Sequence, residues 1–142
     1  MQPLVLDTNV VLDAFVFADE DARPLEPALA QGRFTWVATL AMREELERVL
    51  GYPRIVPRLD HYGLDAAQVL AAFDRYTRIV DVPAKAPATC ADPDDQKFID
   101  LAVARSALLL SRDAAVLSMK NRLARLDVAV RAALGPLPAP SA

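Results

Sequence analysis

Short apolar runs alternate with amphipathic stretches along the chain, and this alternation predicts strands and helices in turn. Residues 3–7 (PLVLD), 34–39 (FTWVAT), 78–82 (RIVDV) and 107–112 (ALLLSR) have the length and apolar content of buried strands. Residues 126–131 predict a weaker final strand. Between them, residues 40–50 (LAMREELERVL) form an amphipathic helix pattern that ends at Gly51 and Pro53.

Four further helices are expected between the strands, at 10–18, 24–31, 65–77 and 93–107, and a fifth follows at 114–122. Thr8 or Asn9 is the expected N-cap of the first helix. Residues 82–93 (VPAKAPATCADP) predict a proline-rich loop. Strands that alternate with helices predict an α/β fold, with a mostly parallel sheet in the middle of three α/β/α layers.

The composition fits one globular domain. The chain has 142 residues, of which 54% are hydrophobic and 25% charged. We expect this domain over residues 1–134 and a disordered tail over 135–142 (GPLPAPSA). Cys90 is the single cysteine, so an intrachain disulfide or a thiolate metal cluster is excluded. No signal peptide or membrane span is evident, and we expect a soluble cytoplasmic protein.

The charge is unevenly distributed. The net charge is −3, which by itself disfavours a nucleic-acid partner. Residues 1–95 hold 9 basic and 16 acidic residues, whereas residues 96–142 hold 7 basic and 3 acidic ones. If several of the early acids share a site for divalent cations, the charge that faces a phosphate backbone is less negative than the formal count.

Two acids stand at the ends of predicted strands. Asp7 ends the first apolar run, which resumes at Val10, and Asp113 follows ALLLSR. The carboxyl ends of parallel strands meet at one edge of a sheet, where ligands bind. For Asp113, capping of the next helix is as good an explanation as a ligand role. For Asp7 it is not, because Thr8 and Asn9 are better placed to cap the first helix.

Two more acids lie on the apolar sides of helices. Glu45 lies three residues from Met42 and four from Val49, which favours a functional role for this acid. The alternative explanation is a salt bridge with Arg48 at the boundary of the buried face. Glu44 and Glu47 are explained as solvated partners of Arg48 and Arg43.

Asp95 shares a helical face with Phe98 and Ile99, although a helix start at Asp92-Pro93 explains acids there. Asp92 and Asp94 are interpreted as cap and first-turn acids. His61 lies in a polar segment, Arg58 to Gly63, and is interpreted as a surface residue.

Clustered carboxylates repel one another unless they are protonated or bind a metal ion. Oxygen ligands from Asp7, Glu45, Asp95 and Asp113, supported by Asn9, suit Mg²⁺ or Mn²⁺. Four basic residues near these acids are candidates for phosphate contacts, with solubility as the alternative for each: Arg43, Lys97, Arg112 and Lys120.

Four segments in order, LVLDTNVVLDAF, LAMREELERVL, DPDDQKFIDLA and ALLLSRDAAVL, resemble the successive motifs of PIN-domain nucleases. The resemblance covers about residues 3–120 and is to the VapC-like toxins of toxin-antitoxin pairs in particular. Ser111 stands where threonine is usual, and Ala115 where many relatives have another aspartate.

The resemblance implies a PIN-like domain in which Asp7, Glu45, Asp95 and Asp113 form the catalytic and metal-binding quartet, with Asn9 and Ser111 as polar support. It implies a Mg²⁺- or Mn²⁺-dependent ribonuclease that cleaves single-stranded RNA, a homodimer, and an antitoxin protein as partner. Two alternatives stay open. A receiver-like phosphoacceptor would need an acid pair after the first strand and a late lysine. A catalytically silent RNA- or protein-binding module is compatible with every residue.

Overall fold

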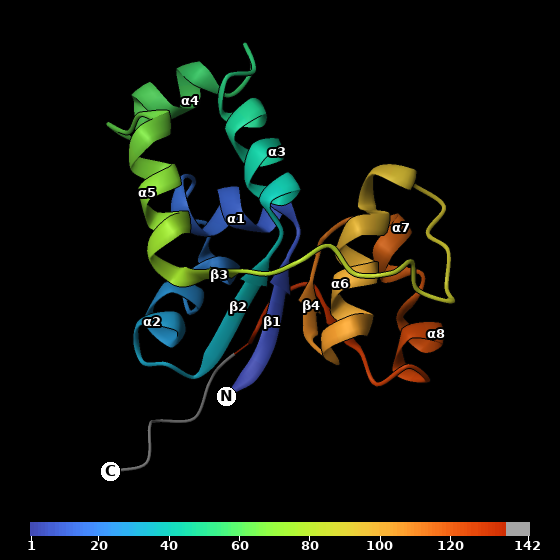
Figure 1. The fold of residues 1–142 in the computed structure, drawn as a ribbon. Coiled ribbons are helices and arrows are strands. Elements are labelled where there is room, and N and C mark those ends of the chain that lie inside the picture. Colours follow the sequence, from blue (N-terminus) through green and yellow to red (C-terminus); the bar gives the residue numbers. More distant parts are fainter. Residues whose placement is uncertain (136–142) are drawn as a thin grey trace.

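The computed structural model describes residues 1–135 and contains a five-stranded parallel sheet between helices (Figure 1). The strand order is β3-β2-β1-β4-β5, and every neighbouring pair is parallel. The strands are β1 (Gln2–Leu6), β2 (Phe34–Ala38), β3 (Thr77–Ile79), β4 (Leu108–Leu110) and β5 (Ala129–Arg131). The predicted α/β class and the parallel sheet are confirmed.

The helices cover both faces of the sheet. They are α1 (Thr8–Phe15), α2 (Leu25–Ala30), α3 (Leu40–Leu50), α4 (Val56–His61), α5 (Ala66–Tyr76), α6 (Gln96–Arg105), α7 (Ala114–Leu117) and α8 (Lys120–Ala124), with 3-10 helices η1 (Glu20–Ala22) and η2 (Pro93–Asp95). Figure 1 shows α1, α2 and α5 on one side and α6, α7 and α8 on the other. The strand order reverses between β1 and β4, which is where a crevice opens in open parallel sheets.

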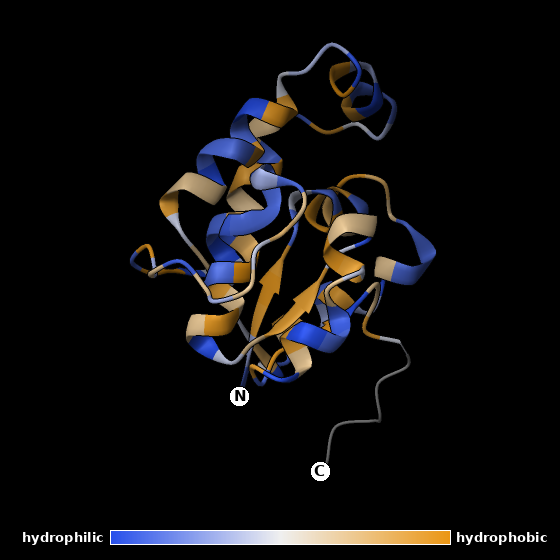
Figure 2. Ribbon diagram, turned by 90° about the vertical axis from the view of Figure 1, so that its right-hand side faces the viewer, coloured by the Kyte–Doolittle hydropathy of each residue, from blue (hydrophilic) through white to orange (hydrophobic). Residues whose placement is uncertain are grey.

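The core follows from burial of the central strands on both faces. Leu4, Val5 and Leu109 are fully buried, as the continuous apolar runs predict. Figure 2 shows the strands as hydrophobic ribbons between helices that carry hydrophilic residues on part of their surface. Trp36 of β2 stacks on Phe15 at 5.8 Å and therefore packs α1 against the sheet.

Three details of the predicted elements are wrong. The first helix begins at Thr8, because Asp7 itself is extended and accepts a hydrogen bond from the Asn9 N–H as N-cap. The helix expected at 114–122 is two short helices, with the buried Met119 between them. Helix α4 was not predicted, because only Leu59 in VPRLDH is buried and its apolar pattern is too short to detect.

The segment 80–92 contains no helix or strand, which confirms the predicted loop over 82–92, whereas the strand predicted at 78–82 ends at Ile79. Two side chains of α6 hold this segment in place. The Gln96 amide accepts from the Cys90 N–H at 2.7 Å and donates to the Ala88 carbonyl at 3.0 Å. Asp100 accepts from the Ala86 N–H at 2.8 Å. These bonds fix the chain that leads into η2. Of the tail expected at 135–142, residues 136–142 lie outside the described residues.

None of the helices in residues 1–135 is long and apolar enough to cross a bilayer.

Replacing Gln96 by alanine should loosen this loop, because the Cys90 N–H and the Ala88 carbonyl lose their partner. We expect a loss of about 1–3 kcal/mol in the free energy of unfolding, measured by urea denaturation, and faster hydrogen exchange at the Cys90 amide. Gln31→Ala, at an exposed position, is the matched control. Unchanged protection of the Cys90 amide in Gln96→Ala would contradict the role of Gln96 in holding this loop.

Candidate active site

Asp7 lies directly after β1, at the point where the strand order reverses. Its N–H donates to the Leu110 carbonyl of β4 at 3.0 Å, which continues the pairing of the two strands. Its Oδ1 accepts from the Asn9 N–H at 3.1 Å, and its Oδ2 accepts from the Ser111 hydroxyl at 2.8 Å. The carboxylate is 4% exposed and fixed on both oxygens.

Ser111 connects the acids of the two strands. It is fully buried, and its Oγ donates to Asp7 while it accepts from the Asp113 N–H at 3.1 Å. Asp113 is the N-cap of α7 and accepts from the Ala115 N–H at 2.8 Å. The predicted capping role of Asp113 is therefore confirmed, and the same geometry directs its carboxylate to the carboxyl edge of the sheet.

After the ends of β1 and β4, the third segment that contributes to the site is η2, with Asp92 as its N-cap and Asp95 as its last residue. Asp92 caps η2 by accepting from the Asp94 N–H at 3.0 Å. Asp95 is 8% exposed, and its Oδ2 is buried without a hydrogen-bond partner among the described residues. One carboxylate oxygen each from Asp92, Asp95 and Asp113 lie within 4.8 Å of one another.

The proximity of these acids affects the pKa values of Asp95 and Asp7. Burial, together with the negative charges of Asp7, Asp113 and Asp92, raises the pKa of Asp95 to about 7. Burial also raises the pKa of Asp7, and the hydrogen bonds from Ser111 and Asn9 oppose that shift. The site therefore concentrates more negative charge than the surrounding protein neutralises.

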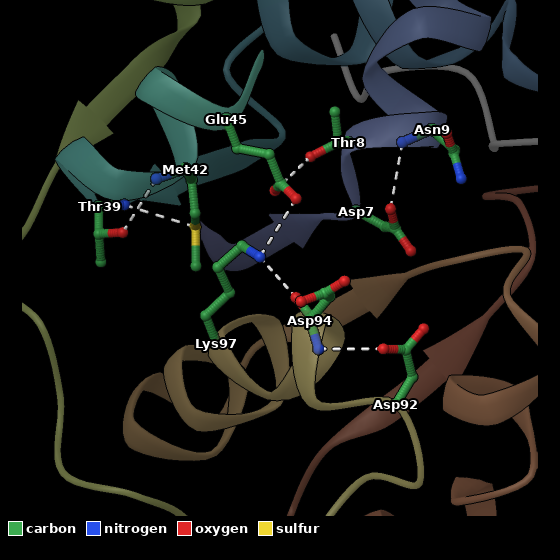
Figure 3. A network of polar contacts seen from close by, with 9 residues as sticks. All are labelled: Asp7, Thr8, Asn9, Thr39, Met42, Glu45, Asp92, Asp94 and Lys97. Atoms are coloured by element: carbon green, nitrogen blue, oxygen red, sulfur yellow. Dashed lines mark hydrogen bonds and ion pairs between the residues drawn. The ribbon is translucent and has the colours of Figure 1, made fainter. Parts of the chain in front are cut away.

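Glu45 of α3 lies at the border of this cluster (Figure 3). It accepts from the Thr8 hydroxyl at 2.8 Å and from Lys97 Nζ at 3.2 Å, so its partner is Lys97 and not Arg48. Its charge contributes to the raised pKa of Asp7. Glu45 thus faces the predicted site, but an ion pair occupies one of its oxygens.

The basic residues predicted to contact phosphate differ in their position relative to the acids. Lys97 lies at the site through Glu45 and also donates to the Asp94 carbonyl. Arg43 forms two hydrogen bonds with Asp74 of α5, at 2.7 and 2.9 Å, rather than pairing with Glu47.

Arg112 follows β4 and pairs with Asp13 at 3.2 Å and Asp19 at 3.5 Å. Lys120 begins α8, and no ion pair of the described residues joins it to the acids. His61 is exposed, as expected.

Asp92 is the acid that sequence reasoning missed. Its position before Pro93 fits an ordinary helix start, and the structure confirms that capping role. A capping aspartate uses one oxygen for the backbone, and nothing in the local sequence tells where the other oxygen lies. The run Asp92-Pro93-Asp94-Asp95 was the available signal, because three acids in four residues are more than one cap requires.

Comparisons with known proteins agree with this architecture. A solved structure similar to the chain is the crystal structure of VapBC2 from Rickettsia felis bound to a DNA fragment from their promoter. The two chains are 14% identical with a TM-score of 0.58, and the match covers 91% of this chain and 97% of that chain, which shows a shared fold. No curated protein matches the sequence. A family model described as PIN domain matches residues 3–115, from β1 through β4 to the start of α7. The chain therefore belongs to the PIN domain family.

Proposed function

We propose that the chain is a Mg²⁺- or Mn²⁺-dependent endoribonuclease that hydrolyses phosphodiester bonds of single-stranded RNA. The observation that carries the proposal is the buried Oδ2 of Asp95, which has no partner among residues 1–135 and lies beside two more carboxylates. An unpaired buried carboxylate oxygen is costly, and a cation bound among the three acids removes that cost.

The donor set fits a hard divalent cation. Asp92, Asp95 and Asp113 offer carboxylate oxygens within 4.8 Å of one another, and Asp7 approaches the same edge through its bond with Ser111. Mg²⁺ and Mn²⁺ prefer such oxygen ligands. We assign the metal to Asp95 and Asp113 with Asp7, add Asp92 as a ligand, and place Glu45 at the border of the site.

The chain's own residues orient this site. When bound, a divalent cation acts as a Lewis acid on the phosphoryl oxygen and on the attacking water. Ser111 holds Asp7, and the backbone amides of Asn9 and Ala115 hold Asp7 and Asp113, so both carboxylates are fixed before substrate arrives. Thr8 holds Glu45 in the same way. Such fixed ligands lower the reorganisation that catalysis requires.

We infer that single-stranded RNA is the substrate, because the resemblance to PIN-domain nucleases implies it and because unpaired nucleotides reach a crevice at a sheet edge that a duplex does not enter. We further propose that the chain is the toxin of a toxin-antitoxin pair with an antitoxin protein as partner, supported by its likeness to the VapBC2 chain. A homodimer and a cytoplasmic location remain predictions.

Cleavage of a labelled single-stranded RNA tests the proposal. Wild type should cut with Mn²⁺ or Mg²⁺ and not with EDTA, and Asp7→Asn and Asp95→Asn should each lower the rate by about 100-fold or more, since each removes a fixed charge from the reacting site. Asp81→Asn, an exposed acid, is the matched control. Intact RNA with wild type and every metal would favour the silent binding module. Cutting that survives both substitutions would indicate a contaminant.

Metal affinity should depend on pH through Asp95. Its raised pKa of about 7 means that a proton occupies this carboxyl below neutrality and must leave before a cation binds. Mn²⁺ affinity, measured by calorimetry, should therefore be constant above pH 8 and fall with decreasing pH, by up to about tenfold per pH unit below the pKa. Asp95→Asn should bind Mn²⁺ weakly with a flatter pH profile. An equally steep profile in this variant would contradict the assignment.

A further inference from the structure

A cavity of about 640 Å³ adjoins the acidic site and contains side chains that the proposed chemistry does not use. Asn9 and Asp113 form its border with the acids. The remaining walls come from the end of α1, the residues around the start of α4, and the turn after β4. The volume lies within the range of about 300–1,000 Å³ that small-molecule sites occupy, which is sufficient for a nucleotide.

Arginines dominate the wall that α4 provides. Arg54 and Arg58 are exposed, and neither forms an ion pair with another residue of the described chain. Each lies beside an aromatic ring instead. The guanidinium carbon of Arg58 is 3.6 Å from the centroid of the Phe17 ring, and that of Arg54 is 5.8 Å from the centroid of Tyr52. Cation–π contact orients a guanidinium without neutralising its charge.

The acids in the cavity other than Asp113 are already paired. Arg112 lies between Asp13 and Asp19, at 3.2 and 3.5 Å, and offsets one of their two negative charges. Burial raises the pKa of Asp13, and the positive charges of Arg112 and Arg58 oppose that shift. On one wall the cavity thus presents the guanidinium groups of Arg54 and Arg58, which form no ion pair within residues 1–135, and at its border it presents the candidate metal ligand Asp113. This distribution of charge suits a nucleic-acid strand that places one phosphate at the acids and its next phosphates along the arginine wall.

We infer that this cavity is the subsite for the nucleotides adjoining the bond that is cleaved, with Arg54 and Arg58 contacting phosphates and Phe17 supporting a stacked guanidinium. The inference rests on the proposed nuclease function and names its substrate contacts. Arginine forms paired hydrogen bonds with phosphate, and its planar group also stacks on bases. The ring centroids of Phe17 and Tyr62 lie 6.2 Å apart, so a second aromatic ring is close to Phe17.

An acidic protein segment is the competing occupant, because phosphates and carboxylates both bind arginine. The aromatic rings beside Arg54 and Arg58 favour nucleic acid, since bases stack on aromatic and guanidinium planes and acidic side chains do not.

The test measures binding of a fluorescein-labelled ten-nucleotide oligouridylate by anisotropy in EDTA, with the RNA checked on a gel for integrity. Arg54→Gln/Arg58→Gln should weaken binding about tenfold or more. The slope of log affinity against log salt should fall in magnitude by roughly 0.7 for each lost phosphate contact. Arg33→Gln/Arg78→Gln changes the net charge equally outside the cavity and should have a much smaller effect.

Two further measurements separate the possible outcomes. Mn²⁺ binding by the double variant should equal that of wild type, which shows an intact fold and acid site. Equal RNA affinity and slope in the two double variants would overturn the subsite, while cleavage by wild type would leave the nuclease proposal standing. Wild type that neither binds nor cleaves RNA would overturn both. A polyglutamate peptide that binds as tightly as the RNA, with the same loss in Arg54→Gln/Arg58→Gln, would assign the cavity to a protein partner.

Discussion

Electrostatic repulsion among clustered carboxylates is the constraint on which the rest of the site depends. Burial raises the pKa of Asp7 and of Asp95, and the negative charges of neighbouring acids raise both further. Neither a lysine nor an arginine pairs with Asp7, Asp92, Asp95 or Asp113 in residues 1–135. Such an arrangement persists only where a rigid frame imposes it. The parallel pairing of β1 with β4, extended by the bond from Asp7 to Leu110, is that frame.

The central strands of this frame were largely predictable, because continuous apolar runs of this length are typical of strands that are buried on both faces. PLVLD and ALLLSR located the two central strands, and LAMREELERVL located α3 with its bounds. Elements with few buried residues were not predictable in the same way. VPRLDH buries Leu59 alone, and the helix after Asp113 divides at Met119, where tertiary packing overrides the local pattern.

The candidate site was predictable in part for a similar reason. Asp7 and Asp113 follow strands, so the topology alone brings them together, and Ser111 joins them. Asp92 and Arg58 act over long separations in sequence, and their local patterns have ordinary explanations as a cap and a surface charge. The partners of Arg43 and Glu45 also come from other elements, Asp74 and Lys97, whereas sequence spacing favoured neighbours on the same helix.

The clustered acids are expected to form a metal centre, and anomalous diffraction from crystals grown with Mn²⁺ at pH 8 tests this most directly. We predict a manganese peak in contact with the carboxylate oxygens of Asp95 and Asp113, with Asp92 or Asp7 beside it. A structure with Mn²⁺ bound only elsewhere, or with these carboxylates unchanged and free of metal, would contradict the account.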